Sequence, residues 1–384
     1  MLLWGVAVAV VAAGVAYGLW GLWVLLRRGP RRTFWWRVRD QPPPGLADGT
    51  FGEHRYLHLK GLRLHYVTRG PPTAPLLLLL HGFPQNWFCW RHLLQDLGTR
   101  YRVVALDLRG YGASEKPPGR DSYRLEVLLE DIRQVIEILG PPPCILVGHD
   151  WGGLLAWEVA SSHPEMVEKL VIMDRAAPRR HGFMACHLSQ LLRSSYIFLF
   201  QLPWLPELLL SLADFETPCP PGGPTAGADG ADGLVVGIQN AAQRLTEQEV
   251  DAYLYGLSQP GGLTPPLNYY RNLFRDTPIP REPPPLPTLL LWGAEDAFLD
   301  ARLVPCLRRC LRPTARLCLL HRCRPLAARG PAAPRRPPAG PLPGHGGPPP
   351  LAAPRGAPPP AEGRGAVGWG REGPNGRVGT ATLG

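Results

Sequence analysis

Hydrophobic and polar positions follow distinct patterns along the 384-residue chain. Residues 1–26 form an uncharged apolar stretch, and later apolar runs such as 76–80 alternate with segments of helical period such as 125–139. Continuous apolar runs are typical of buried parallel strands, and Gly140 marks the end of the helical segment that precedes the next strand. This alternation of strands and helices predicts an α/β fold with a doubly wound, mostly parallel sheet.

The first expected strand, residues 62–68, alternates apolar and polar positions, so we expect it to be antiparallel and to lie at the edge of the sheet. Directly after the strand at 76–80, the Phe83-Pro84 bond suits a tight turn with a cis peptide. The further strands are expected at residues 102–106, 144–147, 170–173 and 288–292.

Residues 175–285 interrupt the alternation and are predicted to form an inserted helical lid. Thr246 and Glu249 make a capping box for one of its helices. A flexible loop is expected at 217–233, which holds four Pro, five Gly and no large apolar side chain. The lid helices are expected at residues 188–200, 206–212 and 247–257.

The uncharged stretch at residues 1–26 is longer than the roughly 20 residues that cross a bilayer, which predicts a transmembrane signal anchor. The alternative, a cleaved signal peptide, would begin with positive charge and hold a shorter apolar core. Because the neighbouring Arg residues all follow the span, the rest of the chain is expected on the cytosolic side of the membrane. The membrane is expected to be that of the endoplasmic reticulum or microsomes. Trp20, Trp23, Trp35 and Trp36 suit an interfacial belt.

The net charge of +10 has a local source, since residues 301–384 hold 14 Arg, no Lys and two Glu, a sum of +12. The remaining residues sum to −2, so no nucleic-acid partner is expected. The eight Cys residues show no disulfide framework and fit no common zinc spacing, and neither a metal nor a cofactor is expected. The chain does not predict its oligomeric state.

The predicted organisation has six segments. They are the anchor (1–26), a basic, Pro-containing linker (27–49), the first part of the core (50–174), the lid (175–285), an incomplete second part of the core (286–323) and a disordered tail rich in Pro, Gly and Arg (324–384).

The turn at residues 148–153, with the sequence Gly-His-Asp-Trp-Gly-Gly, carries the most specific chemistry. It joins the apolar run 144–147 to the helix-like segment 154–160, and glycines flank one central polar residue. This spacing is typical of the nucleophile elbow of α/β-hydrolases, where glycines let the backbone pass closely. The central residue, Asp150, is ionised near neutral pH, so it can attack an epoxide or an alkyl halide without a base and form an alkyl ester.

Four motifs stand in one order along the core. They are His81-Gly82-Phe83-Pro84, Asp107 to Gly112 (DLRGYG), Gly148 to Gly153 (GHDWGG) and Trp292 to Asp296 (WGAED). Together they resemble the epoxide hydrolases of the α/β-hydrolase superfamily. Two lid segments, 198–207 and 268–274, are similar to the membrane-anchored subgroup of that family, and the resemblance covers about residues 50–315.

The resemblance implies a two-step reaction on lipophilic, fatty-acid-type epoxides, which gives vicinal diols. An aspartate opens the ring to a covalent ester, and a His-Asp pair then activates the water that hydrolyses this ester. Asp150 matches the nucleophile, the backbone N–H groups of Phe83 and Trp151 match the oxyanion hole, and Asp296 matches the acid that orients the His. Asp296 could also be a loop or cap residue, although its place after a buried strand favours a catalytic role.

Tyr270 and Tyr196 match the two lid tyrosines that bind the epoxide oxygen and give it a proton. Both could instead be core aromatics with satisfied hydroxyls. The family normally carries Glu after the Pro of its first motif, whereas this chain has Gln85, which weakens the case for a water-orienting group there.

The catalytic His is missing from its expected place, a G-H-W-like loop roughly thirty residues after Asp296. Downstream, the chain has His321 and His345, and neither lies in that context. Arg324-Pro325-Leu326-Ala327 can be encoded so that a one-nucleotide shift gives Gly-His-Trp-Leu. We therefore hypothesise a shifted reading frame beyond about residues 311–323, and we expect impaired turnover in this chain.

Two other functions stay open on the sequence. A haloalkane or haloacid dehalogenase shares the Asp nucleophile and the Trp after it, but haloalkane dehalogenases usually carry Asn where Phe83 stands. A non-catalytic, membrane-tethered pseudo-hydrolase would explain the missing His.

Overall fold

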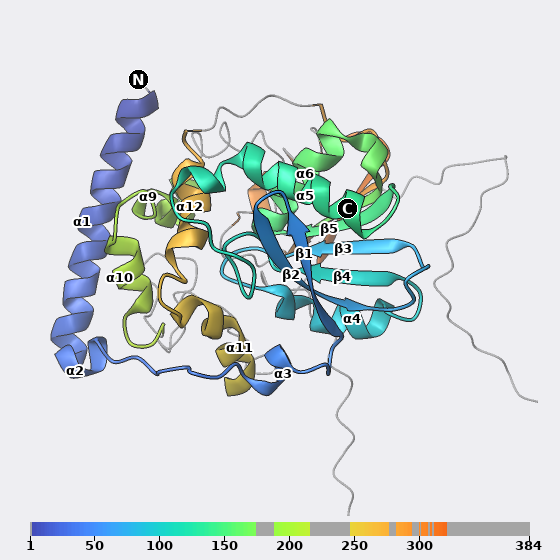
Figure 1. Ribbon diagram of the computed structural model, residues 1–384. Coiled ribbons are helices and arrows are strands. Elements are labelled where there is room, and N and C mark those ends of the chain that lie inside the picture. Colours follow the sequence, from blue (N-terminus) through green and yellow to red (C-terminus); the bar gives the residue numbers. More distant parts are fainter. Residues whose placement is uncertain are drawn as a thin grey trace, which may run out of the picture. The chain divides into compact units, whose positions relative to one another are not determined.

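The computed structural model describes residues 2–173, 188–215, 246–275, 282–293, 299, 301–305, 308 and 311–320. Within these ranges the strands form one eight-stranded sheet with the order β1-β2-β4-β3-β5-β6-β7-β8 (Figure 1). β1 and β2 pair antiparallel, β2 pairs antiparallel with β4, and the other neighbours are parallel. The strands are β1 (Glu53–Leu59), β2 (Leu62–Arg69), β3 (Leu76–Leu80), β4 (Arg102–Leu106), β5 (Cys144–His149), β6 (Val167–Met173), β7 (Thr288–Gly293) and β8 (Ala315–Leu320).

The expectation that residues 62–68 form the sheet edge is wrong, because β1 pairs with β2 on its outer side. β1 buries only Leu57 and Leu59, so its hydrophobic pattern is weak in the sequence. A second strand that the pattern did not predict, β8, extends the sheet beside β7. The predicted doubly wound, mostly parallel sheet is confirmed.

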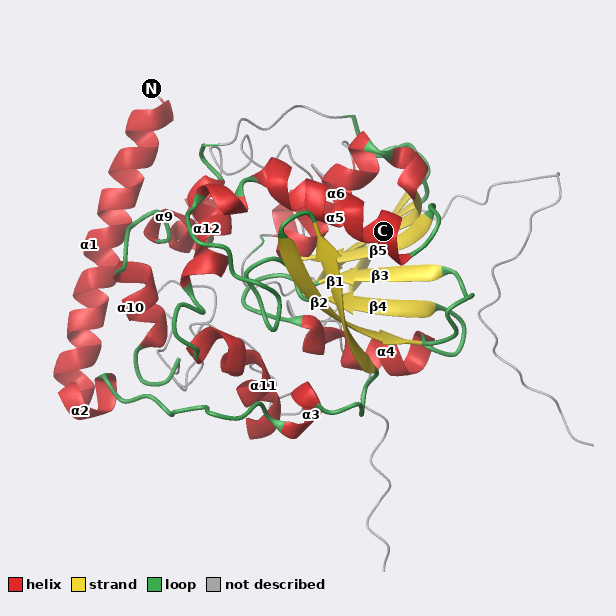
Figure 2. Ribbon diagram, in the orientation of Figure 1, coloured by secondary structure: helices red, strands yellow, loops and turns green. Residues whose placement is uncertain are grey.

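Alternate residues of the central strands contribute to two separate hydrophobic clusters, as the strand period of two requires. Leu78 and Leu80 of β3 pack with α5 (Leu125–Leu139) and α6 (Asp150–Ser162), whereas Leu77 and Leu79 pack with η1 (Trp87–Trp90) and α4 (Arg91–Leu97). The sheet therefore lies between two helical layers, with α5 and α6 on one face and α4 on the other (Figures 1 and 2). The bounds of α5 confirm the helix expected at 125–139.

The segment predicted to be the lid, for which we keep that name, contributes five described helices, which are α8 (Leu188–Arg193), α9 (Ser195–Leu199), α10 (Leu205–Ser211), α11 (Glu247–Ser258) and α12 (Thr264–Asn272). The single helix expected at 188–200 is interrupted at Ser194. The capping box of Thr246 and Glu249 is confirmed at the start of α11. Helix α12 was not predicted, because its first turn holds Pro265 and Pro266, which fit the start of a helix but also mark turns.

The N-terminal residues form α1 (Leu2–Arg28), α2 (Pro30–Thr33) and α3 (Pro44–Ala47), and α1 contacts α9 of the lid. α1 is long and apolar enough to cross a membrane, with a mean hydropathy of 2.0 in its most apolar window. Short 3-10 helices complete the described structure at η2 (Asp121–Tyr123), η3 (Pro164–Met166) and η5 (Ala301–Leu303). The flexible loop expected at 217–233 and the tail expected at 324–384 lie outside the described residues.

Candidate active site

Asp150 lies at a sharp corner between β5 and α6. Its backbone has a φ of 47°, in the left-handed region that costs a residue with a side chain about 1 kcal/mol or more. The corner is tight, because the N–H of Gly152 donates to the carbonyl oxygen of His81 at 3.0 Å, and a Cβ at Gly148 would meet the Gly152 carbonyl. This is the geometry of a nucleophile elbow, which lifts the central side chain out of the backbone.

The loop after β3 supplies a hydrogen bond to the Asp150 carboxylate. The backbone N–H of Phe83 donates to its Oδ2 at 3.1 Å, and the Phe83-Pro84 peptide is cis, as the sequence suggested. Gly82 permits this approach, because a Cβ there would lie 2.5 Å from the Cβ of Asp150. Trp151 follows Asp150 in the first turn of α6, where backbone N–H groups favour negative charge.

His81 fixes the position of this loop. Its Nε2 accepts from the N–H of Leu108 at 3.1 Å, so its Nδ1 carries the proton and donates to the carbonyl oxygen of Gly82 at 3.0 Å. The side chain is fully buried, and burial lowers its pKa. A neutral His81 therefore ties the loops after β3 and β4 together beside the elbow.

An aromatic cluster includes Phe83 and Trp151, which lie beside Asp150. The ring of Tyr270 is 5.5 Å from that of Phe83, 5.1 Å from that of Trp151 and 5.9 Å from that of Tyr196. Tyr196 comes from α9 and Tyr270 from α12, so the lid supplies both phenols and the core supplies the carboxylate.

The hydroxyl of Tyr270 keeps its proton. Burial raises its pKa well above the usual value of 10.0, and the negative charge of Asp150 raises it further. A neutral phenol close to a carboxylate is a hydrogen-bond donor, which can bind an oxygen atom that becomes negative while the carboxylate attacks the neighbouring carbon.

The two tyrosine-bearing helices are held together by polar contacts of the lid. Arg271 donates from Nε to the carbonyl oxygen of Phe200 at 3.2 Å and from Nη2 to that of Leu202 at 2.8 Å. Its Nη2 also lies 2.9 Å from a carboxylate oxygen of Glu207. The side chain of Gln201 donates to the carbonyl oxygen of Tyr270 at 2.8 Å. In the sequence, the segments 198–207 and 268–274 indicated only a family resemblance. Their role in holding the two helices together was not predicted.

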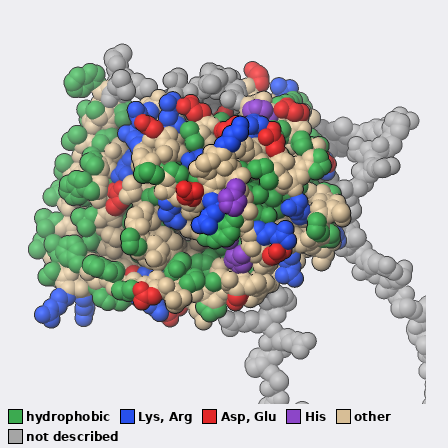
Figure 3. Space-filling model, viewed as in Figure 1, with side chains coloured by type: hydrophobic (Ala, Val, Ile, Leu, Met, Phe, Trp, Pro, Cys, Tyr) green, Lys and Arg blue, Asp and Glu red, His purple; other side chains and the backbone are tan. Residues whose placement is uncertain are grey.

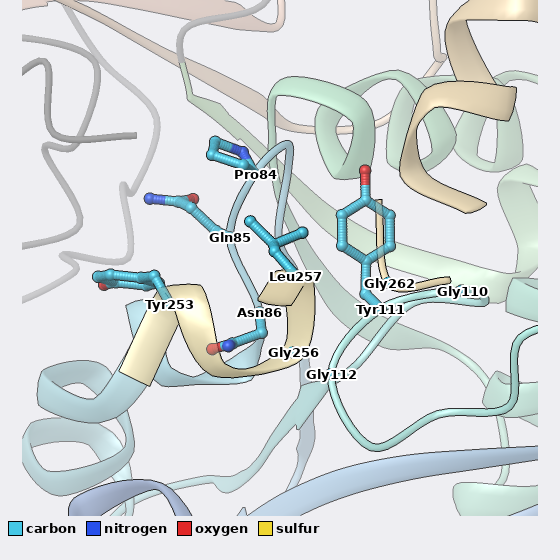
Figure 4. Close-up of a pocket in the computed structure, with 10 residues that line it drawn as sticks. All are labelled: Pro84, Gln85, Asn86, Gly110, Tyr111, Gly112, Tyr253, Gly256, Leu257 and Gly262. Carbon is cyan, nitrogen blue, oxygen red and sulfur yellow. The ribbon is translucent and has the colours of Figure 1, made fainter. Parts of the chain in front are cut away.

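Tyr111, from the DLRGYG motif, is a further phenol that sequence reasoning missed. It is 2% exposed, its hydroxyl has no hydrogen-bond partner among the described residues, and burial and the charge of Asp150 raise its pKa well above 10.0. It lines a small pocket of about 10 Å³ between the loops after β3 and β4 and helix α11 (Figure 4). This is about the space of one water molecule, whereas ligand pockets are about 300 Å³ or more, so this pocket is no substrate cavity. The other labelled residues of Figure 4 are Pro84, Gln85, Asn86, Gly110, Gly112, Tyr253, Gly256, Leu257 and Gly262.

The structure brings five of the six residues named from the sequence into one site: Phe83, Asp150, Trp151, Tyr196 and Tyr270. The sixth, Asp296, lies outside the described residues, as do the two downstream histidines. The described part of the chain holds no group of three or more His, Cys, Asp or Glu that could bind a metal ion.

Comparison with known proteins agrees with this geometry. The family model for the alpha/beta hydrolase fold matches residues 75–209. Epoxide hydrolase 3 of Xenopus tropicalis is 46% identical over 291 residues, which are 75% of this chain and 77% of that protein. Epoxide hydrolase 4 of Homo sapiens is 42% identical over 285 residues, 73% of this chain and 76% of that protein.

Solved structures of epoxide hydrolases are also similar to this chain. A point mutant of an epoxide hydrolase from Bacillus megaterium has a TM-score of 0.60 and 31% identity, and the match covers 70% of this chain and 93% of that one. Another mutant of that enzyme, complexed with its product (R)-3-[1]naphthyloxy-propane-1,2-diol, has a TM-score of 0.59 and 29% identity, with coverage of 71% and 93%. The fold and the aspartate elbow define an α/β hydrolase. Within that class, the chain belongs to the epoxide hydrolase family, and it is similar to epoxide hydrolases 3 and 4.

Proposed function

We propose that this protein opens lipophilic, fatty-acid-type epoxides by forming a covalent ester on Asp150, and that its hydrolytic step is impaired. The observation that carries the proposal is the position of Asp150, whose carboxylate accepts the Phe83 N–H at 3.1 Å while the buried phenol of Tyr270 lies within its electrostatic reach.

In the first step, a carboxylate oxygen of Asp150 attacks an epoxide carbon and the C–O bond of the ring breaks. The departing oxygen takes a proton from Tyr270 or Tyr196 and becomes a hydroxyl, and the phenolate regains its proton from solvent. The Phe83 N–H holds the carboxylate in place, and the strained backbone of Asp150 directs its side chain away from the sheet.

In the second step, water attacks the ester carbonyl, the oxyanion accepts hydrogen bonds from the N–H groups of Phe83 and Trp151, and the diol leaves with Asp150 restored. This step needs a base, which family members provide as a His oriented by an acid, here Asp296. Because the sequence has no His in the expected context, we expect the ester to accumulate.

We also propose that α1 anchors the protein in the endoplasmic reticulum or microsomal membrane, with the catalytic domain in the cytosol. The supporting observations are the length and hydropathy of α1 and the Arg residues, which lie in its last turn and after it.

The test is intact-mass measurement of the full chain after incubation with styrene oxide or an epoxy fatty acid. The expected result is a stable adduct of one epoxide mass on the wild-type chain and none on an Asp150→Asn variant. Diol formation at many turnovers would overturn the impaired hydrolytic step. Absence of both adduct and diol would overturn the whole proposal, and release of chloride from a halogenated alkane would favour a dehalogenase.

A further inference from the structure

The outer face of α1 is a continuous apolar stripe. Its large side chains recur every three or four residues, so they share one side of the helix, and each is 50–76% exposed. The stripe consists of Val8, Val11, Val15, Leu19, Leu22 and Leu26. Figure 3 shows apolar side chains gathered along the edge where Figure 1 places α1.

The opposite face of α1 packs against the lid. A Cβ at Gly14 would lie 2.8 Å from Cδ1 of Leu202, and a Cβ at Gly21 would lie 2.8 Å from Cδ2 of Leu209, so the two glycines let the lid approach the helix backbone. The hydroxyls of Tyr17 and Ser195 are 3.0 Å apart. These contacts follow the helix from residue 14 to residue 21, about 10 Å at 1.5 Å per residue. α1 is therefore docked along the lid and is not a free stalk.

The linker binds the same part of the lid. Arg39 pairs with Asp214 through both Nη atoms, at 2.7 and 2.8 Å, and its Nε lies 3.0 Å from Oδ1 of Asp251. The side chains of Arg39 and Asp214 are 6% and 8% exposed, so this pair is buried. The N–H of Ala213 donates to the carbonyl oxygen of Thr33 at 2.8 Å. Because α1 and the linker both contact the lid, a membrane that binds α1 also fixes the position of the lid.

Two lid helices expose apolar side chains of their own: α10, which packs on α1, and α8, which contacts α9. Trp204 is 70% exposed and Leu208 is 40% exposed on α10 and its N-cap, and Leu192 of α8 is 55% exposed. Trp204 has a φ of 48°, a left-handed conformation that is uncommon for a bulky residue. The neighbouring Leu209 is buried and packs over α1, so α10 has one apolar face on α1 and another in solvent.

We propose that the outer stripe of α1 and the exposed lid residues Leu192, Trp204 and Leu208 form one lipid-contact surface, so that α1 lies in the membrane interface along the lid and the lid enters the interface with it. Three observations favour a bilayer as the occupant: α1 has membrane-spanning hydropathy, Trp side chains suit the interface, and Arg27, Arg28, Arg31 and Arg32 at one end match anionic headgroups.

The inference rests on the membrane anchor of the proposed function and not on its chemistry. The test reconstitutes the full chain in phosphatidylcholine–phosphatidylserine vesicles that contain a phosphatidylcholine with a diazirine in its acyl chain. After photolysis, the labelled peptides are identified by mass spectrometry. We expect label in α1 and in peptides from residues 188–215. Label in α1 with none in the lid would overturn the inference, because α1 would then hold the lid away from the bilayer.

Two variants test whether the exposed lid side chains contact lipid. The double variant Trp204→Ser, Leu208→Ser changes only exposed side chains, so the fold should persist, and the lid peptides should lose their label. The control Ile138→Ser alters a side chain that is 51% exposed on α5, and it should leave the labelling unchanged. If a second copy of the chain covered this surface, lid peptides would cross-link between copies and stay free of lipid label, which would also overturn the inference. A failure to form the Asp150 adduct would affect none of these results.

Discussion

The side-chain amide of Gln201 donates a hydrogen bond to the backbone carbonyl oxygen of Tyr270 at 2.8 Å. Arg271, the next residue, donates in the opposite direction to the carbonyl oxygen of Phe200. These reciprocal contacts join α9, which carries Tyr196, to α12. The relative position of the two phenols therefore depends on a few buried polar contacts.

Replacing Arg271 by Met should lower the free energy of unfolding by about 2–4 kcal/mol, because two carbonyl oxygens and the Glu207 carboxylate lose a mostly buried donor. The control Arg275→Met breaks an exposed pair with Asp121 and should cost less than about 1 kcal/mol. Urea unfolding in detergent solution measures both. Equal effects of the two substitutions would contradict the role of Arg271 in joining α9 to α12.

Tyr270→Phe should slow alkylation of Asp150 by about 100-fold or more, since the ring oxygen loses a proton donor, while the free energy of unfolding changes little. The adjacent Tyr269 provides a control, because its hydroxyl donates to the carbonyl oxygen of Arg109 at 2.7 Å. Tyr269→Phe should cost about 1 kcal/mol of stability and leave the alkylation rate unchanged. Both rates come from adduct mass against time in single-turnover experiments. Equal rates of Asp150 alkylation in the two variants would contradict the role of Tyr270 as a proton donor.

The alkylation rate should stay constant from about pH 7 to about pH 10. Burial and the nearby Asp150 charge raise the pKa of Tyr270 well above 10.0, so the protonated form that donates to the epoxide oxygen persists over this range and is lost only at higher pH. Adduct formation at a series of pH values measures the profile. A fall in rate centred at or below the ordinary tyrosine pKa would show that an exposed phenol supplies the proton.

Gly82→Ala should prevent adduct formation, because the added Cβ would lie 2.5 Å from the Cβ of Asp150 and 2.9 Å from its Oδ2. Displacing the carboxylate breaks its hydrogen bond with the Phe83 N–H. Gly140→Ala is the matched control, since its backbone is extended and a Cβ there meets nothing within 4 Å. Mass spectrometry reports the adduct, and circular dichroism reports the fold. A Gly82→Ala variant that alkylates normally would show that this close approach is dispensable.

The sequence predicted the parts of the fold that depend on local pattern. The Leu run of β3, the periodic helix α5 and the capping box at Thr246 all occur where the spacing placed them. β1 and α12 were missed for local reasons: β1 is mostly exposed, and the first turn of α12 holds two prolines. Hydrophobic periodicity finds elements with one clear buried face, and neither of these has that signal.

The candidate site could be predicted only in part. Asp150 was found because the elbow is a local turn with a fixed spacing of glycines. The two lid tyrosines came from a resemblance, since their meeting with Asp150 depends on contacts between α9, α12 and the core that no spacing encodes. Tyr111 lies in the DLRGYG motif, but the motif did not predict its part in the site, because only burial shows that its hydroxyl lacks a partner among the described residues.

The buried pair between Arg39 and Asp214 decides how a shortened form of this protein should be produced. Removing residues up to 28 would uncover Leu202 and Leu209 but would keep the guanidinium that joins the linker to α10 and α11. Removing the first fifty residues would also leave the Asp214 carboxylate buried without its counterion. A shortened form should therefore begin near Gly29. Leu202 and Leu209, which this truncation exposes, should be changed to polar residues for solubility.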